Sequence, residues 1–312
     1  MNILVTGASG FVGGHLVPAL AAAYPDATLI LCGDRDGYRS IDLVDHAAVD
    51  RLVQEVRPEA CIHLAAISAI PVARGNPDRA WAVNLGGTLA LARSILRHAA
   101  ACRLVFASSA DCYGASFRSG LALDEAQALA PMNTYAATKA AADLALGAMA
   151  AEGLSCVRLR CFNHTGPGQT PDFVVPAFAR QVARVAAGLQ EPVLRVGALA
   201  PFRDFLDVRD VCAAYVACVA PERDLAPGSI LNIASGRPVR IGDVLDALVA
   251  RAGITAEIVT SSALLRPTDI ALAAGENAAA RAALDWAPRI PWAQTLDDVL
   301  ADWQARVLTE AA

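Results

Sequence analysis

The sequence predicts an α/β protein, built as a Rossmann-type doubly wound parallel sheet with a smaller C-terminal α/β domain. Short apolar runs alternate with longer helical patterns through the first half of the chain, which is typical of parallel βαβ units. The glycine-rich turn VTGASGFVG joins the first strand to the first helix, and the Gly/Pro-rich stretch HTGPGQTP interrupts the alternation after residue 163. We therefore expect a Rossmann domain over 1–163, to which part of 203–237 returns, and a smaller substrate-binding domain over 164–312.

The individual elements follow from local pattern. Apolar runs bounded by turn residues predict strands, at 2–7, 28–33, 60–66, 103–109 and 154–163. Amphipathic or Ala-rich stretches between them predict helices, at 10–24, 46–58, 84–100 and 133–153. Pro58 closes the second helix, Asn133 or Thr134 caps the fourth, and Gly153 ends it. After residue 163, PVLRVG and SILNIASG predict two further strands among several helices, which indicates a cap over the sheet.

Composition excludes several classes of protein. Of 312 residues, 55% are hydrophobic and 18% are charged, so a disordered chain is not expected. The net charge is −5 and no basic run occurs, which argues against nucleic-acid binding. No apolar run reaches the ~20 residues of a membrane span, and the start MNILVTG is a strand and turn rather than a secretory signal. We expect a cytoplasmic protein that does not bind membranes.

The cysteines and histidines do not suggest a metal site. The eight cysteines form no C-x-x-C pair and lie mostly in apolar segments, so we expect buried free thiols. The five histidines lack the spacing of metal ligands. His63 lies at a buried strand end, where a hydrogen-bonded core histidine is expected, and His164 lies beside the loop that we expect to contact substrate.

The turn after the first strand carries the pattern of a dinucleotide site. Gly7, Gly10 and Gly13 follow a strand and open a helix whose first residues are Phe11 and Val12. Glycines let the backbone approach a pyrophosphate, and the helix N-terminus favours its negative charge. At the end of the second strand, CGDRD offers Asp34 for a ribose 2′-hydroxyl and Arg35 for a 2′-phosphate. Because Asp34 lies slightly beyond the usual position of the acid, NADP(H) is favoured and NAD(H) is the alternative.

Tyr135 and Lys139 share one face of the predicted helix at 133–153. A phenol with its ordinary pKa of about 10 is a poor acid or base near pH 7. A nearby Lys⁺ favours the phenolate, so we expect Lys139 to lower the pKa of Tyr135 and make it a proton donor and acceptor. Ser109, at the end of the fourth strand, completes a Ser–Tyr–Lys set.

These motifs, in this order, resemble the extended short-chain dehydrogenase/reductases of the NAD-dependent epimerase/dehydratase family, which act on nucleotide sugars. The matching segments are TGASGFVG, HLAA, VNLGGT, SSADCYG, YAATK and RCFNHTGPGQ. The resemblance implies that Ser109 and Tyr135 bind the sugar oxygen that is or becomes a carbonyl, and that Lys139 holds the nicotinamide ribose. It places the adenine beside Asp42 and Leu43. It also implies further cofactor contacts from Leu64, Ala65, Ala66 and Asn84.

The second half of the chain narrows the resemblance to GDP-4-dehydro-6-deoxy-mannose reductases. The segments concerned are FNHTGPGQTPDFVVPAFARQV, RDFLDVRDV, NIASG and RPTDI. The resemblance implies a domain that binds a nucleotide sugar, with contacts from Ser68, Ser109, Asn163, Val175, Arg180, Arg203 and Arg266. The three arginines suit a diphosphate, since guanidinium pairs bidentately with phosphate. An ion pair that packs the domains together is the alternative for each of them.

Enzymes that resemble this chain catalyse three reactions: reduction of a C4 ketone, 4,6-dehydration and 4-epimerisation. Residues 110–112 bear on the choice between them. The resembling 4,6-dehydratases carry Glu where this chain has Asp111, and a side chain one methylene shorter is expected to miss C5 of the sugar. Ala110 offers no acid for the leaving water, and Cys112 is one position late for the cysteine of the related epimerase–reductases. We therefore expect NAD(P)H-dependent reduction of the C4 ketone of a GDP-4-keto-6-deoxy-hexose, giving GDP-rhamnose.

Other interpretations stay open at this point. GDP-mannose 4,6-dehydratase and nucleotide-sugar 4-epimerase are the enzymatic alternatives. A sensor or scaffold that binds NAD(P) without turnover is the non-enzymatic one, against which the complete Ser–Tyr–Lys set argues. Family analogy and the Ala-rich helices at 84–100 and 134–152 indicate a homodimer built on a four-helix interface.

Overall fold

The computed structural model describes residues 1–265 and 270–310. Its larger lobe is built on a six-stranded sheet with the order β2-β1-β3-β4-β5-β9, in which every pairing is parallel. The strands are β1 (Asn2–Thr6), β2 (Thr28–Cys32), β3 (Ala60–His63), β4 (Arg103–Ser109), β5 (Cys156–Cys161) and β9 (Ser229–Ile233). The Rossmann-type α/β fold predicted from the sequence is thereby confirmed.

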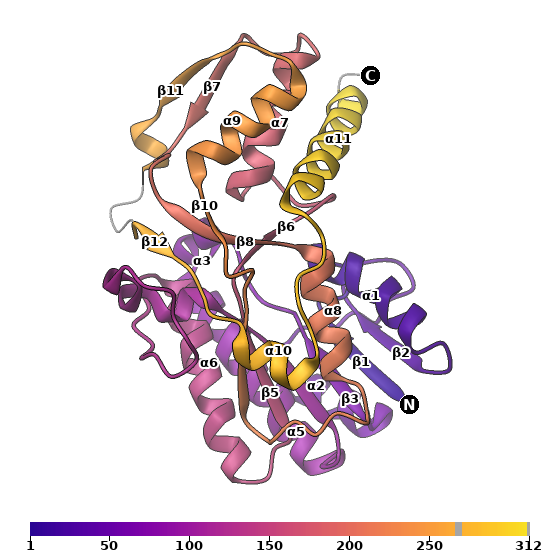
Figure 1. Ribbon diagram of the computed structural model, residues 1–312. Coiled ribbons are helices and arrows are strands. Elements are labelled where there is room, and N and C mark those ends of the chain that lie inside the picture. Colours follow the sequence, from indigo (N-terminus) through magenta and orange to yellow (C-terminus); the bar gives the residue numbers. More distant parts are fainter. Residues whose placement is uncertain (266–269, 311–312) are drawn as a thin grey trace.

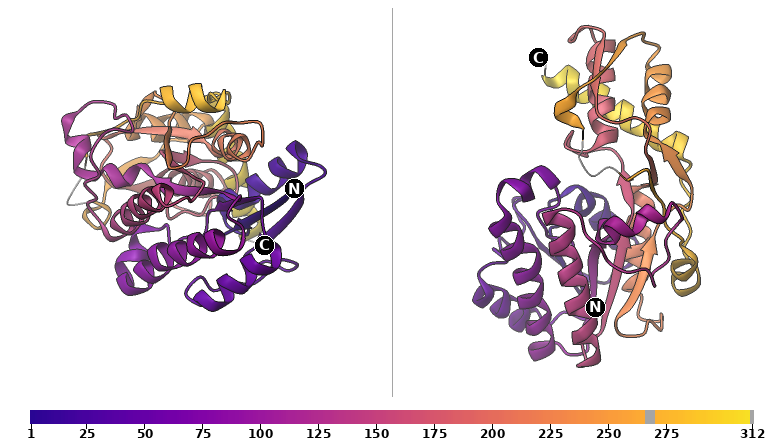
Figure 2. Two further views of the ribbon diagram at one scale, coloured as in Figure 1. Left: turned by 90° about the horizontal axis from the view of Figure 1, so that it is seen from below. Right: turned by 90° about the vertical axis from the view of Figure 1, so that its left-hand side faces the viewer.

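Helices cover both faces of this sheet because alternate strand residues are apolar on both sides (Figures 1 and 2). Ile3 and Val5 of β1 belong to a core shared with α1 and α8, whereas Leu4 belongs to a core shared with α2, α5 and α6. Continuous apolar strands of this kind are expected in a parallel sheet buried on both faces. The helices concerned are α1 (Phe11–Ala23), α2 (His46–Val56), α5 (Thr88–His98), α6 (Thr134–Ala151) and α8 (Val208–Cys218).

The strand order reverses between β1 and β3. From β1 the chain crosses to β2 at one edge, and from β3 it crosses to β4 in the opposite direction. In open sheets of this kind ligands bind outside the carboxyl ends of the strands, at this reversal. The turns after β1, β3 and β4 therefore meet where a dinucleotide is expected. Short helices line this edge, namely α3 (Ile70–Gly75), α4 (Pro77–Trp81), the π-helix η1 (Ala82–Gly87) and the 3₁₀ segment η2 (Ala110–Ser119).

The smaller lobe contains α7 (Val174–Ala186), α9 (Ile241–Ala252) and α11 (Trp292–Glu310), which share one apolar core around Trp303. The parallel pair β7 (Val193–Val196) and β11 (Glu257–Thr260) lies beside them (Figure 1). A second sheet has the order β10-β8-β12, and β6 also pairs with β8. Its strands are β6 (Asn163–Thr165), β8 (Phe202–Asp207), β10 (Pro238–Arg240) and β12 (Leu272–Ala273); η3 (Ser262–Leu264) and α10 (Ala278–Leu284) complete the described elements.

Several elements differ from the sequence-based expectation. β8, the central strand of the second sheet, was not predicted, because FRDFLD carries charges at three of its six positions. The helix expected at 84–100 consists of η1 followed by α5, so the stretch around Asn84 has wider turns than an α-helix. β9 lies beside β5 in the large sheet, and α10 packs against β9 and α8. Within the described residues, no helix has the length and apolar character of a membrane span.

The buried polar groups of the sheet are satisfied internally. His63 hydrogen-bonds Thr6 Oγ1 at 2.6 Å and Thr88 Oγ1 at 2.9 Å, which confirms the expected core histidine. Burial, and secondarily the charge of Lys139, lowers the pKa of His63 to about 3, so the ring is neutral in the folded protein. The eight cysteines are buried free thiols, as expected.

His63 gives the folded protein a specific acid sensitivity. The unfolded chain binds a proton at His63 below its ordinary pKa of 6.5, whereas the folded protein does not until about 3. The free energy of unfolding is therefore undiminished by His63 above pH 6.5. It decreases as the pH falls, because only the unfolded chain gains the proton. Between pH 7 and 5 the loss is about 2 kcal/mol. His63→Gln should remove this part of the pH dependence of urea unfolding, and the exposed His46→Gln should retain it. Equal pH dependence in the two variants would contradict the assignment.

Candidate active site

The turn between β1 and α1 forms a cradle that only glycine allows. Gly7 has φ +73°, and a Cβ placed there would lie 2.7 Å from the backbone nitrogen of Ala65. A Cβ on Gly13 would lie 2.4 Å from the carbonyl oxygen of Ala8. Gly10 is the N-cap of α1 without a side-chain cap, and the first turn contains no acid. The first N–H groups of α1 are thus available to an anion, which fits the pyrophosphate of a dinucleotide.

The loop that follows β2 carries the groups expected to contact the adenosine part of the cofactor. Ser9 Oγ accepts a hydrogen bond from the backbone N–H of Asp34 at 3.1 Å, which fixes the start of this loop. Arg35 lies over the ring of Tyr38 at 5.8 Å from its centroid, with its side chain exposed. Asp42 is also exposed and forms an ion pair with Arg79 at 3.1 Å, and Leu43 is buried. An exposed guanidinium beside the glycine turn suits a 2′-phosphate.

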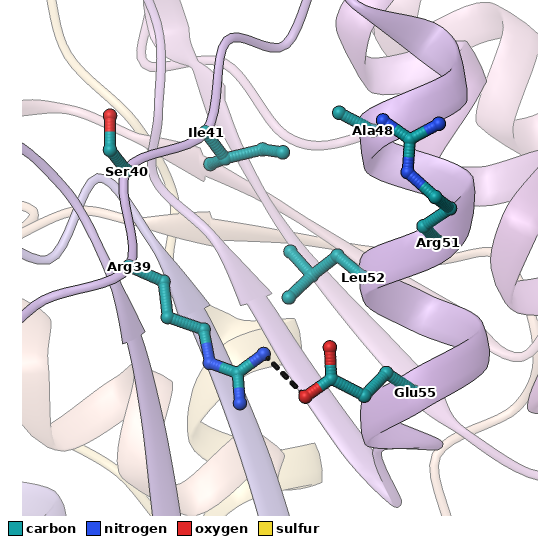
Figure 3. Close-up of a pocket in the computed structure, with 7 residues that line it drawn as sticks. All are labelled: Arg39, Ser40, Ile41, Ala48, Arg51, Leu52 and Glu55. Carbon is teal, nitrogen blue, oxygen red and sulfur yellow. Dashed lines mark hydrogen bonds and ion pairs between the residues drawn. The ribbon is translucent and has the colours of Figure 1, made fainter.

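A hollow of about 400 Å³ opens between the segment after β2 and helix α2 (Figure 3). Arg39 forms an ion pair with Glu55 at 2.9 Å across its lower part, and Arg51 extends along α2 (Figure 3). No sequence motif singled out these two arginines. The hollow is not lined by Ser109, Tyr135 or Lys139, so it lies apart from the Ser–Tyr–Lys set.

Asn84 holds the loop that follows β3. Its side chain accepts from Ile67 N at 2.8 Å and donates to Ile67 O at 3.1 Å and to Thr138 Oγ1 at 3.0 Å. These bonds tie the loop containing Leu64, Ala65, Ala66 and Ser68 to helix α6. Asn84 thereby shapes the cofactor edge by holding this loop, and its expected direct contact with the cofactor stays a prediction. Ser68 is exposed in this loop.

Ser109, Tyr135 and Lys139 converge beyond the end of β4. Ser109 Oγ accepts from the backbone N–H of Asp111 at 3.1 Å, and the Ser109 hydroxyl acts on the Tyr135 phenol by lowering its pKa. Asn133 caps α6 by accepting from Ala136 N at 2.9 Å, which fixes the turn carrying Tyr135. Lys139 is buried; its Nζ donates to Ala107 O at 2.6 Å and lies 4.6 Å from the Phe106 ring centroid. The set predicted from the sequence is thus brought together.

The expected lowering of the Tyr135 pKa is wrong for this arrangement. Burial raises the pKa of Tyr135 above its ordinary value, the negative charge of Asp111 raises it further, and the Ser109 hydroxyl only partly offsets both. Lys139 is directed to the β4 backbone, and burial lowers its own pKa to about 8. Tyr135 is therefore a protonated phenol near neutral pH, which makes it a proton donor.

A buried charge cluster beneath this set was not predicted from the sequence. Asp143, on α6, is fully buried and pairs with Arg158 at 3.1 Å and Arg160 at 3.0 Å, both on β5. Ser108 Oγ donates to the same carboxylate at 2.6 Å. Arg160 also donates to Tyr113 Oη at 3.1 Å. The sequence did contain a signal for this cluster. Arg158 and Arg160 stand at alternate positions of an otherwise apolar strand, and charges buried in a protein require oppositely charged partners.

The segment after β5 lies against the cofactor edge. Asn163 is exposed at the start of β6, and His164 stacks in parallel with Phe11 of α1 at 6.3 Å between centroids. His15 Nε2 contacts Pro167 O at 2.8 Å. The loop from 163 to 170 is thereby attached to the helix that begins the dinucleotide cradle. Burial lowers the pKa of His164, so its ring is neutral.

Four further residues were expected to contact the substrate. Val175 is buried in the apolar core of the smaller lobe, and its contact with a substrate stays a prediction. Arg180 pairs with Glu310 of α11 at 3.3 Å and lies over Trp303, which favours the packing alternative. Arg203 donates to Phe202 O at 2.8 Å and Ile270 O at 2.7 Å. Arg266 lies outside the described residues.

The residues that distinguish the reactions line the start of η2. Ala110 is buried and apolar, and Asp111 is half-buried. Cys112 is fully buried, with Sγ directed to Ala136 O at 3.8 Å, and burial raises the pKa of its thiol to about 12. A neutral thiol held inside the protein cannot serve as an acid–base group for a sugar. Among the described residues, no three His, Cys, Asp or Glu side chains gather as metal ligands.

Comparison with known proteins gives a consistent result. The family model described as GDP-mannose 4,6 dehydratase matches residues 4–299. GDP-6-deoxy-D-mannose reductase of Pseudomonas aeruginosa is 36% identical over 99% of both chains. dTDP-glucose 4,6-dehydratase of Streptomyces antibioticus is 30% identical over 83% of this chain and 79% of its own.

Solved structures agree over nearly the whole chain. RMD from P. aeruginosa complexed with NADPH superposes with a TM-score of 0.87 at 35% identity, covering 98% of this chain and 99% of that one. UDP-glucose 4-epimerase of Thermus thermophilus in complex with NAD gives a TM-score of 0.83 at 28% identity, covering 97% of this chain and 99% of that one.

Two neighbouring glycines of α1 test the cradle. Gly13→Ala should weaken NADPH binding about tenfold or more, a loss of ~1.4 kcal/mol, because its Cβ would press on Ala8 O and distort the turn. Gly14→Ala should leave binding unchanged, since a Cβ there has no neighbour within 4 Å. Titration calorimetry gives both dissociation constants. Equal affinity of the two variants would show that the turn does not hold the cofactor.

Proposed function

This chain belongs to the GDP-mannose 4,6 dehydratase family, within the extended short-chain dehydrogenase/reductases, and we propose from this premise that it is a ketoreductase. Its substrate is a GDP-4-keto-6-deoxy-hexose, whose C4 ketone it reduces to a hydroxyl, with GDP-rhamnose as the product. The observation that carries the proposal is the Ser109–Tyr135–Lys139 set beside the glycine cradle, in a chain similar throughout to a GDP-6-deoxy-D-mannose reductase.

Each member of the set has a defined task. The reduced nicotinamide cofactor, when bound, supplies the hydride to C4. Tyr135 donates the proton to the ketone oxygen, and its raised pKa keeps that proton available near neutral pH. Ser109 accepts from Asp111 N, so its own hydroxyl hydrogen is directed to a second acceptor, the ketone oxygen. Lys139, fixed by Ala107 O, would hold the nicotinamide ribose through its remaining N–H groups.

The alternatives require groups that this site lacks. A 4,6-dehydratase needs a base at C5 and an acid for the 6-hydroxyl. Asp111 is one methylene shorter than the glutamate of the resembling dehydratases, and Ala110 supplies no acid. The cysteine of epimerase–reductases has no counterpart, because the Cys112 thiol lies inside the protein.

NADP(H) is the favoured cofactor, with NAD(H) as the alternative. The exposed guanidinium of Arg35 next to Gly33 and Asp34 supports a 2′-phosphate. The similar RMD structure contains NADPH, whereas the similar 4-epimerase contains NAD. The glycine cradle fits the pyrophosphate of either. The buried free thiols support a reducing compartment, in keeping with the cytoplasm.

A homodimer is supported by an apolar face on α6. Leu144 is 60% exposed and shares this face with Ala137, Ala141, Ala145 and Ala148, at helical spacing. Small side chains allow a second helix to approach closely. A second copy that presents α5 and α6 in the same way would cover the face and form a four-helix interface.

The reductase assignment has a direct assay. The enzyme should consume NADPH when mixed with freshly made GDP-4-keto-6-deoxy-mannose, followed by the near-ultraviolet absorbance of the cofactor. Tyr135→Phe should lower kcat about 100-fold or more while NADPH still binds, because only the proton donor is lost. No consumption by folded enzyme would refute the reductase. Loss of water from GDP-mannose without a hydride donor would establish the dehydratase instead, and a cellular role unaffected by Tyr135→Phe would favour a sensor.

The dimer is tested by a charge on its proposed face. Leu144→Glu should yield monomers at micromolar concentration, because the interface would bury an unpaired carboxylate. Leu308→Glu introduces the same change at a site that is 62% exposed on α11, in the smaller lobe, and it should remain dimeric. Sedimentation equilibrium gives both masses. A monomeric mass for the unaltered protein would reject the proposal.

A further inference from the structure

The helix that begins the dinucleotide cradle also holds the loop expected to contact the substrate. We propose that His15 of α1 is a positioning residue that couples the two. Through its hydrogen bond to Pro167, a bound NADPH favours the conformation of residues 163–170 that receives the nucleotide sugar. The identity of this second ligand rests on the proposed function. No contact with cofactor or substrate was expected of His15 itself.

Two side chains of α1, one turn apart, face this loop. Phe11, in the first turn, stacks in parallel with His164 at 6.3 Å between ring centroids, and it meets the His15 ring edge-on at 5.5 Å. His15 Nε2 lies 2.8 Å from Pro167 O. A carbonyl oxygen only accepts, so Nε2 carries a proton and donates it. The N–H groups of the same first turn are those available to the pyrophosphate.

The loop is closely packed and bonded within itself. A Cβ placed on Gly166 would lie 2.5 Å from Cγ1 of Val208, the first residue of α8, so the loop backbone approaches that helix directly. Thr165 Oγ1 donates to Gln169 Oε1 at 2.7 Å, and Gln169 Nε2 donates to His164 O at 3.2 Å. A restraint on one part of the loop therefore acts on the rest of it.

On its other side the loop is attached to the smaller lobe. Asp302 of α11 accepts from Gly168 N at 2.9 Å, and Arg306 of the same helix donates to Gln169 O at 3.1 Å. The Arg306 guanidinium lies 3.8 Å from the ring centroid of Trp303, which belongs to the apolar core of that lobe. The cofactor cradle and the lobe expected to bind the nucleotide sugar are thus joined through this loop.

These contacts link the affinities of the two ligands. A pyrophosphate at the first turn of α1 fixes that turn, and Phe11 and His15 pass the restraint to the loop, which begins at the exposed Asn163. The nucleotide sugar then meets a loop that is already ordered, so less conformational entropy is lost when it binds. Such coupling is reciprocal, and the nucleotide sugar must strengthen the binding of NADPH by the same factor.

The first test is hydrogen exchange, which needs no substrate. Saturating NADPH should slow the exchange of amides in residues 163–170 of the unaltered protein, and should not slow it in His15→Ala. His15→Gln should restore the protection, because its amide can donate to Pro167 O. His98→Ala is the matched control and should keep the protection. That histidine is also half-buried and its Nε2 contacts Asp50 at 3.1 Å, but it lies on α5, on the opposite face of the sheet from α1.

The second test measures the coupling by titration calorimetry with GDP-mannose, a nucleotide sugar without a ketone to reduce. NADPH should tighten its binding about tenfold in the unaltered protein and in His98→Ala, but less than about twofold in His15→Ala. Equal tightening in the unaltered protein and His15→Ala, or NADPH that leaves the exchange of residues 163–170 unchanged in the unaltered protein, would overturn the proposal. Protection that depends on His15, in a protein that binds neither GDP-mannose nor GDP-4-keto-6-deoxy-mannose, would uphold the role of His15 and refute the proposed reaction.

Discussion

The candidate site depends on one buried carboxylate, that of Asp143, and the two arginines that surround it. Asp143 lies on α6 four residues beyond Lys139, and Arg158 and Arg160 reach it from β5. Ser108, next to Ser109, donates to the same group. The interaction therefore fixes the helix that carries Tyr135 and Lys139 against the strand that carries Ser109. Breaking such a cluster leaves an uncompensated charge in the interior, so its members must remain together.

The same cluster extends to the loop that follows β4. Arg160 donates to Tyr113 Oη and to Glu125 O, and Tyr113 in turn donates to Asn232 of β9. Glu125 accepts from the backbone of Asn232 at 2.7 Å. Loop, helix and three neighbouring strands are thus joined through buried polar groups. On the other side, contacts from α1 and α11 hold the 163–170 loop, the latter through Asp302 to Gly168 N.

The sequence predicted the large sheet well because its strands are buried on both faces and read as continuous apolar runs. The catalytic set was also accessible, since Ser109, Tyr135 and Lys139 occur in short motifs with fixed spacing. The predictions that failed concern contacts between residues that are far apart in the sequence. Nothing local shows that Arg180 meets Glu310, or that Lys139 turns toward β4. β8 was missed because its charged residues find partners only in the folded protein, as Asp204 does at Ser235 and Gly236.

The burial of all eight cysteines has a practical consequence for spectroscopy. Their pKa values are all raised, with burial as the first cause, so the reactive thiolate is scarce at neutral pH. Maleimide and methanethiosulfonate reagents need an accessible thiolate. A single cysteine introduced on the surface would therefore carry a fluorophore or spin label selectively in the folded protein. A pair of such cysteines, one on each lobe, would report the distance between the lobes without first removing any native thiol.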